Sequence, residues 1–283
     1  LLPGLLFLLL FKYVPMYGVL IAFKDYTPSL GVWGSKWVGL KYFEMFWNNP
    51  LTLRLVRNTF LLGLYTLIWA FPAPIVLALL IHEIRVKWFK RWVQTIAYFP
   101  HFLSVVIIVG FVKEFAALDG MFNTILGWFG REPVAMLSDP RYFRTLFIGS
   151  GIWQNAGWGT IIYLAALSGV DPALYEAASI DGANRWQRMR HVVWPAIVPV
   201  TTIMLILSLG SIVGTDFQKV LLMYNPSVYE TADVIDTFVY RMGILGAQYE
   251  YSAAVGLMLS VVAFCFVAAG NWLAGKVSDT RLW

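Results

Sequence analysis

The chain has 283 residues, of which 59% are hydrophobic and only 13% are charged. Soluble globular proteins average about 25% charged residues, so this composition excludes an ordinary soluble domain and predicts an integral membrane protein. The net charge of +5 is typical of basic cytoplasmic loops, and no basic stripe with interleaved aromatics lies outside the apolar segments, which argues against nucleic-acid binding.

Six apolar segments are long enough to cross about 30 Å of hydrocarbon at about 20 residues each. The first could pass for a signal-peptide core, but no small-residue cleavage site follows it, so we interpret it as a retained span. The sequence begins without a methionine, and we expect a native N-terminal piece before it. We therefore predict an all-α membrane protein with one transmembrane domain over residues 1–283 and spans at about 1–23, 58–81, 95–115, 144–167, 192–213 and 253–274.

Prolines inside two of these segments predict kinks, because a proline removes a backbone hydrogen bond that neighbouring helices must compensate. They are Pro72 and Pro74 in the second span and Pro195 and Pro199 in the fifth.

Lysine and arginine are about twofold denser on one side of the six spans than on the other, which predicts that this side is cytosolic. Both termini and the loop at 168–191 lie on it, in what we expect to be a bacterial inner membrane. The basic residues of this side are Arg85, Lys87, Lys90, Arg91, Arg185, Arg188, Arg190, Lys276 and Arg281.

The long loops of the opposite side are rich in aromatic residues, including Trp33, Trp37 and Trp47 in the first of them. Such residues are typical of an interfacial belt with amphipathic helices that lie on the membrane. A docking surface for an external partner is the alternative, and the pattern leaves both open.

The cytosolic loop at 168–191 carries strong helix-boundary signals. Asp171-Pro172 predicts an N-cap followed by proline at the first helical position, for a helix that ends near Ile180. Gly182 supplies the permissive φ of a turn. Asn184 and Gln187 have the spacing of a capping box for a second helix that re-enters the apolar region. A helix-turn-helix between spans predicts a docking element for something outside the membrane.

No set of residues suited to catalysis emerges. His82, His101 and His191 are scattered, with no second ligand at metal-site spacing. The one cysteine, Cys265, excludes a cysteine cluster and an intramolecular disulfide. There is no phosphate-binding loop that ends in Gly-Lys-Ser/Thr, so we expect no nucleotide, metal or other cofactor on this chain, and no enzyme activity of its own.

Polar residues inside spans are costly and tend to face an interior or a water-filled path. Aromatic platforms with amides and hydroxyls suit sugars, but the same groups could only bond helices together, and we keep both interpretations. The candidates for a substrate path are Trp153, Gln154, Asn155 and Trp158 in the fourth span, and Ser208, Ser211, Thr215 and Gln218 at and after the fifth.

Four basic residues lie within or near spans: Lys12, Lys113, Lys219 and Arg144. Long basic side chains near span ends usually extend their charge to the interface, and we take this as the default for all four. Attraction of an anionic substrate is the alternative.

The loop at 168–191 also carries a family pattern. Glu176-Ala177-Ala178, Asp181-Gly182-Ala183, Trp186, Pro195 and Pro199 resemble the EAA loop of permease subunits of binding-protein-dependent ABC importers. Met189 and Val192 depart from the Phe and Ile usual there, but both replacements are apolar.

Further motifs make the chain similar to LplB-type carbohydrate permeases and to the larger-loop permease subunit of the bacterial alginate importer. They are Pro15-Met16-Tyr17-Gly18, Ala22-Phe23-Lys24-Asp25, Phe71-Pro72-Ala73-Pro74, Tyr98-Phe99-Pro100-His101-Phe102-Leu103-Ser104, Tyr224-Asn225-Pro226, Ala232-Asp233-Val234-Ile235-Asp236-Thr237 and Leu282-Trp283.

This resemblance implies a six-span type I importer permease. Its partners would be a second homologous permease, two ATPase subunits that hold ATP and Mg, and an extracytoplasmic solute-binding protein. The loop would be the coupling helix, seated in a cleft of the ATPase. A small apolar surface would fit a groove of the ATPase; it consists of Ala173, Leu174, Ala177 and Ala178. Glu176 would form an ion pair or hydrogen bond at the cleft, and Gly182 would set the angle after Asp181. Trp186 and Met189 would anchor the second helix against the bundle.

The resemblance also favours oligosaccharide import, with acidic, uronate-type sugars preferred to neutral ones. Other classes are a stand-alone secondary transporter or channel and a membrane-bound glycan enzyme. The first should show an internal inverted repeat or intramembrane ion sites, and the second clustered carboxylates at a membrane face. Neither feature is found outside the segments that already match the permeases.

Overall fold

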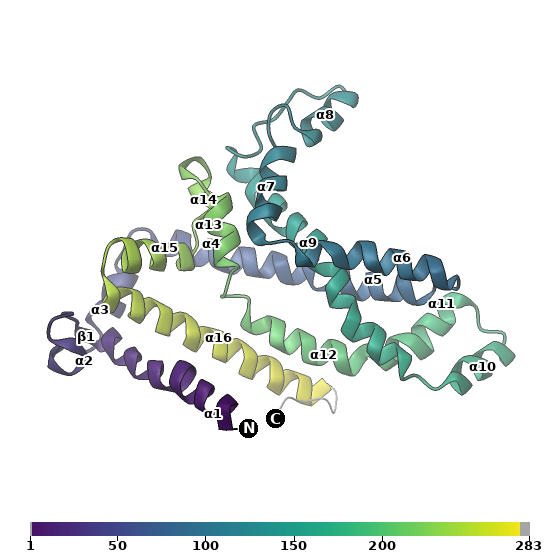
Figure 1. Ribbon diagram of the computed structural model, residues 1–283, viewed down its shortest axis with the longest axis horizontal. Coiled ribbons are helices and arrows are strands. Elements are labelled where there is room, and N and C mark those ends of the chain that lie inside the picture. Colours follow the sequence, from purple (N-terminus) through teal and green to yellow (C-terminus); the bar gives the residue numbers. More distant parts are fainter. Residues whose placement is uncertain (1, 278–283) are drawn as a thin grey trace.

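The computed structural model describes residues 2–277, and Arg281 and the Leu282-Trp283 ending lie outside this range. The prediction of an all-α fold is confirmed (Figure 1). Within the described residues the sheet is limited to two short antiparallel strands, β1 (Lys24–Asp25) and β2 (Lys36–Trp37), which pair Lys24 with Trp37 and Asp25 with Lys36.

Four continuous helical segments are long and apolar enough to cross a membrane. They cover the first, second, fifth and sixth predicted spans, and the second and fifth begin six or seven residues before the predicted position. The segments are Leu2–Phe23 (α1 Leu2–Leu8, η1 Leu9–Tyr13, η2 Val14–Phe23), Thr52–His82 (α4 Thr52–Tyr65, η3 Thr66–Ala70, α5 Pro72–His82), Arg185–Gly210 (α11 Arg185–Arg188, η5 Met189–Val193, α12 Trp194–Gly210) and Tyr249–Lys276 of α16 (Tyr249–Val277).

Three of these segments contain a wide π-helical turn that ends two residues before a proline. The turns η1, η3 and η5 precede Pro15, Pro72 and Pro195. In η3, Phe71 N–H reaches back five residues to the carbonyl of Thr66, at 3.3 Å. The wide turn relieves the steric conflict between a proline ring and the preceding helical turn. Of the four predicted kink sites, Pro72 and Pro195 follow such a turn, whereas Pro74 and Pro199 lie within α5 and α12.

The third predicted span, at 95–115, is a pair of helices with a sharp bend rather than one straight helix. Helix α6 (Lys87–Tyr98) runs on through η4 (Phe99–Phe102), and α7 (Val105–Phe115) then turns away by 100° (Figure 1). Pro100 opens the short 3₁₀ turn, and Ser104 caps α7 by accepting a bond from Ile107 N–H at 3.4 Å. The segment from Pro100 to Ser104 thus ends one helix and starts the next within an apolar stretch of sequence.

The fourth span corresponds to α9 (Pro140–Ser168), which has 29 residues and an N-cap at Asp139. It is longer than predicted and less apolar than the four segments above, because it contains Arg144, Gln154 and Asn155. Helix α10 (Pro172–Ile180) follows it.

The remaining elements belong to the long loops. They are α2 (Gly31–Gly34), α3 (Lys41–Trp47), α8 (Met121–Trp128), α13 (Phe217–Met223), η6 (Pro226–Val228), α14 (Tyr229–Ala232), α15 (Ile235–Tyr240) and η7 (Arg241–Leu245).

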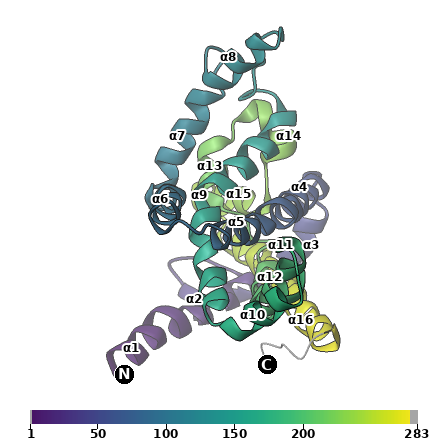
Figure 2. The ribbon, with the colours of Figure 1, turned by 90° about the vertical axis from the view of Figure 1, so that its right-hand side faces the viewer.

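The long helices separate the loops into two groups (Figure 1). At one end lie α10, α11 and the connection between α5 and α6. At the other end α2, α3, the two strands and α15 lie together, where Phe46, Phe238 and Tyr251 share one apolar cluster. Figure 2 shows that α7 and α8 extend well away from the bundle, beside α13 and α14.

Candidate coupling loop and translocation path

Helix α10 begins and ends with the geometry that its sequence predicts. The Asp171 carboxylate accepts a bond from Ala173 N–H at 2.9 Å, and Pro172 takes the first helical position. At the other end Gly182 has a φ of +71°, and the N–H groups of Gly182 and Ala183 bond to the carbonyls of Ser179 and Ala178. This is a complete Schellman motif, and it turns the chain sharply toward the next helix.

The outer surface of α10 is uncovered. None of its residues is buried, and Leu174 and Ile180 are 53% and 87% exposed. Glu176 and Ala177 are also exposed, and Ala178 is half-buried. Figure 1 shows α10 projecting beyond the ends of the long helices. The exposed surface of this small helix thus includes alanines, a leucine, an isoleucine and one carboxylate.

One contact that the sequence did not reveal holds α10 to the bundle. The Tyr175 hydroxyl lies 3.2 Å from Nε2 of His82, at the end of the second span, and Tyr175 packs against the cluster of Ile75, Tyr163 and Ile197. Burial raises the pKa of Tyr175, so the phenol stays protonated and can donate to His82. The two residues are 93 positions apart, and a lone histidine gave no sign of this partner.

The second helix of the loop opens with the predicted capping box. Gln187 N–H donates to Asn184 Oδ1 at 2.9 Å, and Asn184 N–H donates to Gln187 Oε1 at 2.8 Å. Arg188 also donates to Ser179 Oγ at 3.3 Å, which ties this helix to α10. The helix then continues directly into the fifth span.

Trp186, which we expected to anchor this helix against the bundle, is 69% exposed. It lines an open apolar groove of about 550 Å³ between α5 and the start of the fifth span, together with Val76, Leu80 and Trp194. Met189 is half-buried and lines the same groove.

The candidate path residues of α9 meet the break of the third span. The rings of Trp158 and His101 are stacked with centroids 4.6 Å apart, and Asn155 Oδ1 lies 3.1 Å from His101 Nδ1. Gln154 donates to the carbonyl of Leu103 at 3.2 Å. Trp153 contacts the ring of Phe111 edge to face. Gln154 and Asn155 therefore form hydrogen bonds with groups at the break between α6 and α7. Trp153, Asn155 and Trp158 also remain exposed.

The hydroxyl stripe predicted for the fifth span is not formed, because α12 ends at Gly210. Ser208 and Ser211 donate to carbonyls of their own helix, those of Met204 and Ser208. Thr215 lies beyond the helix and donates to Asp236 Oδ2 at 2.8 Å. Gln218 is exposed on α13. The predicted stripe assumed that the helix of the fifth span continues to Thr215, but Ser211 and Thr215 lie beyond its end.

Lys219 does not extend its charge outward, so the default prediction is wrong for this residue, and Arg144 is half-buried. Lys219 is 2% exposed, and its ammonium lies 2.8 Å from the carbonyl of Phe147 and over the Phe147 ring. Arg144 donates to Asn58 Oδ1 at 3.0 Å. A cavity of about 270 Å³ lies beside Lys219, between the second span, α9 and α13.

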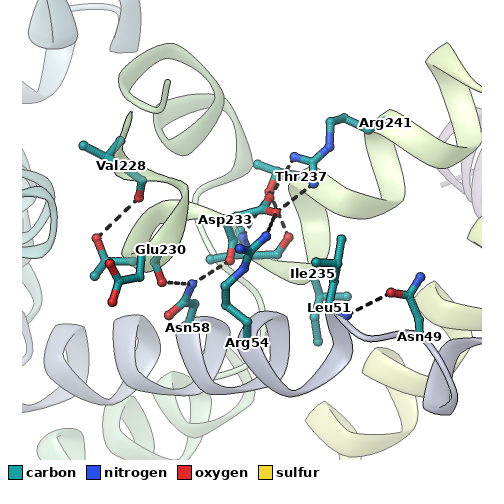
Figure 3. A network of polar contacts seen from close by, with 12 residues as sticks. Asn49, Leu51, Arg54, Asn58, Val228, Glu230, Asp233, Ile235, Thr237 and Arg241 are labelled. Carbon is teal, nitrogen blue, oxygen red and sulfur yellow. Dashed lines mark hydrogen bonds and ion pairs between the residues drawn. The ribbon is translucent and has the colours of Figure 1, made fainter. Parts of the chain in front are cut away.

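A buried ion-pair network joins the start of the second span to the segment before α16 (Figure 3). Asp233 is fully buried, and its two oxygens accept bonds from Arg241 at 2.7 and 2.8 Å. Arg54 lies 3.6 Å away on the other side, and Thr237 donates at 2.8 Å. Asn58 donates to the carbonyls of Glu230 and Asp233. The Asp233 carboxylate is thus held in a structural role by two arginines and a threonine.

Residues 53–279 match the family of binding-protein-dependent transport system inner membrane components. The chain belongs to this family. It is therefore a multi-pass membrane permease component rather than an enzyme by itself.

Two relatives from Bacillus subtilis (strain 168) align with the whole chain. Protein LplB is 47% identical over 283 residues, which are 100% of this chain and 89% of LplB. The polygalacturonan/rhamnogalacturonan transport system permease protein YteP is 44% identical, again over 100% of this chain and 88% of the relative.

Solved structures agree in fold. A chain of a bacterial ABC transporter involved in the import of the acidic polysaccharide alginate superposes with a TM-score of 0.90 and 40% identity, covering 98% of this chain and 94% of that one. A chain of the methionine transporter MetNI shares the fold at a TM-score of 0.61 and 17% identity, covering 82% of this chain and 99% of that one.

Proposed function

We propose that this chain is a transmembrane subunit of an ATP-driven importer that takes up acidic oligosaccharides delivered by an extracytoplasmic binding protein. The observation that carries the proposal is the exposed, doubly capped α10, on a fold shared over nearly its whole length with a permease of an alginate importer. A polygalacturonan/rhamnogalacturonan permease at 44% identity supports an acidic sugar.

In this proposal α10 transmits conformational change from the ATPase subunits to the transmembrane helices. A second permease completes the translocation path, and two ATPase subunits bind ATP and Mg, with α10 seated in a cleft of one of them. Closure of the ATPase pair would move α10, and its links through Tyr175 to His82 and through Arg188 to the second helix would pass the motion to two spans. The loops with α10 would face the cytosol, together with both termini.

The substrate is tested with the importer reconstituted from both permeases, the ATPases and the binding protein. We expect uronate oligomers to stimulate ATP hydrolysis several-fold more than neutral oligosaccharides of the same length. Strong stimulation by a neutral glycan and none by uronates would reject the acidic substrate but keep the importer. Failure of the chain to co-purify with an ATPase and a second permease would favour a stand-alone channel or transporter.

The coupling role is tested by Glu176→Lys. This exposed residue supports no contact within the described chain, so we expect the protein to insert and assemble normally. A positive charge in place of the carboxylate should weaken ATPase docking and reduce uptake about tenfold or more, because reversing one partner of a polar contact replaces attraction by repulsion. Uptake and ATP hydrolysis are measured on the same vesicles. Asp171→Asn, which keeps the capping oxygen on the same loop, is the matched control.

A further inference from the structure

Lys219 is a buried cation whose donors are only partly used. Its ammonium has three donors, and the structure gives it one acceptor, the carbonyl of Phe147 at 2.8 Å, and the face of the Phe147 ring at 4.8 Å. Among residues 2–277 no carboxylate lies within 4.0 Å of this ammonium. Lysine is rarely buried without a counter-ion, because loss of hydration is then uncompensated.

The ammonium lies in the wall of the cavity of about 270 Å³. Opposite α13, the wall is formed by Gly151 on α9, and a Cβ placed there would stand 3.3 Å from Lys219 Nζ. The absence of a side chain at Gly151 therefore leaves space for the Lys219 ammonium. Sites for whole drug-sized ligands measure about 300–1,000 Å³, so this cavity suits one sugar residue of a longer chain.

The other polar groups of the cavity wall suit hydroxyls. Asp216 caps α13 through Oδ1, which accepts Lys219 N–H at 3.1 Å, and the remainder of its carboxylate is exposed. Asn155 is bonded to His101 and to the carbonyl of Gly151, and its side chain is also exposed. Thr66 stands on the facing π-turn η3. The lining holds one cation, Lys219, and one carboxylate, Asp216, which lies more than 4.0 Å from the ammonium and forms no ion pair with it. The ammonium therefore keeps donors for a sugar carboxylate, beside groups that can bind hydroxyls.

We propose that Lys219 and this cavity form a subsite for a carboxylate-bearing sugar residue on its way through the permease. The proposal rests on the proposed function and names the residue that selects the acidic substrate. A uronate carboxylate supplies the missing counter-ion through a charge-assisted hydrogen bond. A neutral sugar leaves the ammonium unpaired, so the site discriminates by the cost of that unpaired charge.

A structural role for Lys219 makes a different prediction. If Lys219 served only to bond Phe147, its replacement would weaken assembly and affect every substrate alike. The charge-selective role predicts that the sign of the side chain matters for uronate uptake. Three variants separate these cases: Lys219→Met removes the charge at similar length, Lys219→Arg keeps it, and Lys113→Met removes an exposed lysine of α7 as the control.

Uptake of a labelled uronate oligomer is measured in vesicles that contain the complete importer and its binding protein, normalised to assembled complex. We expect Lys219→Met to lose at least tenfold, Lys219→Arg to stay within threefold of wild type, and Lys113→Met to be unchanged. Full uptake by Lys219→Met, or equal losses in Met and Arg variants that assemble, overturns the subsite. If wild type transports neutral glycans and no uronates, the acidic substrate of the proposed function fails instead.

A second measurement serves if the lysine variants do not assemble. Thr66→Cys places a thiol in the cavity wall, and the native Cys265 on α16 is exposed and provides an internal reference. In solubilised, actively hydrolysing importer, uronate oligomers should slow labelling of Cys at position 66 by an anionic thiol reagent at least fivefold and leave Cys265 unaffected. Neutral oligomers should protect less. Equal labelling with and without uronate, in a preparation whose ATP hydrolysis uronate stimulates, overturns the subsite and leaves the proposed function intact.

Discussion

Gly182 shows how one backbone angle can decide the shape of the proposed coupling loop. Its φ of +71° lies in the left-handed region, and no atom stands within 4 Å of a Cβ added there. Space is therefore available, and only the backbone conformation selects glycine. The left-handed conformation raises the free energy of a non-glycine residue by about 1–2 kcal/mol, and that of a β-branched residue by more.

We expect Gly182→Val to change the angle between α10 and the second helix and to uncouple uptake from ATP hydrolysis. Gly182→Asn is the matched control, because asparagine tolerates the left-handed region. Both variants should reach the membrane in similar amounts. The ratio of sugar imported to ATP hydrolysed is the measurement, and a wild-type ratio in the valine variant would contradict this role.

Tyr175 makes the link from α10 to the second span through one hydroxyl. Tyr175→Phe removes the 3.2 Å contact with His82 but keeps the ring against its apolar cluster. We expect a loss of about 1 kcal/mol in stability, the usual net value of one hydrogen bond. A double-mutant cycle with His82→Ala checks this by thermal unfolding. Strictly additive effects of the two changes would show that the residues do not interact.

At the scale of elements, the close crossing of α6 and α9 fixes the broken third span. Gly157 lies so near α6 that an added Cβ would be only 1.9 Å from the carbonyl oxygen of Ala97. This neighbour is backbone and cannot swing aside. The crossing holds α6 in place while Gln154 and Asn155 satisfy the break that follows it.

We expect Gly157→Ala to destabilise the protein by about 1–3 kcal/mol, as overpacking does, and to lower the yield of assembled permease. Gly149→Ala on the same helix is the control, since no atom lies within 4 Å of its added Cβ. Thermal unfolding in detergent compares the two. A Gly157→Ala variant as stable as Gly149→Ala would show that the helices separate freely.

At the scale of the whole molecule, Asp233 ties together parts of the chain that are about 175 residues apart. Its carboxylate pairs with Arg241 and Arg54, and its carbonyl accepts a bond from Asn58 of α4. Removing one partner of a buried ion pair typically costs about 3–5 kcal/mol, because the other charge stays buried and unpaired.

Asp233→Asn should therefore impair assembly strongly and lower the thermal unfolding temperature. Asp139→Asn is the matched control, because its partner Arg141 is 82% exposed and surface pairs contribute about 0–1 kcal/mol. The amount of folded permease after detergent extraction is the measurement. Similar yields for both variants would mean that the Asp233 pair does not stabilise the fold.

Local signals explain what could be predicted. The ends of α10, the turn at Gly182 and the box of Asn184 and Gln187 depend on residues within about five positions, so they could be identified from the sequence. The apolar lengths of four spans, the all-α class and the family pattern of the coupling loop are likewise properties of contiguous residues.

Only the tertiary structure decided where the polar groups of the spans find their partners. The break at Leu103 and Ser104 is stable because α9 places Gln154 and Asn155 beside it, and the early end of α12 allows Thr215 to reach Asp236. Lys219 is buried by Phe147 and Gly151 of another helix. Hydropathy and helical periodicity describe how a single segment interacts with lipid. The partners of these polar groups lie on segments that are distant in the sequence and come into contact only on folding.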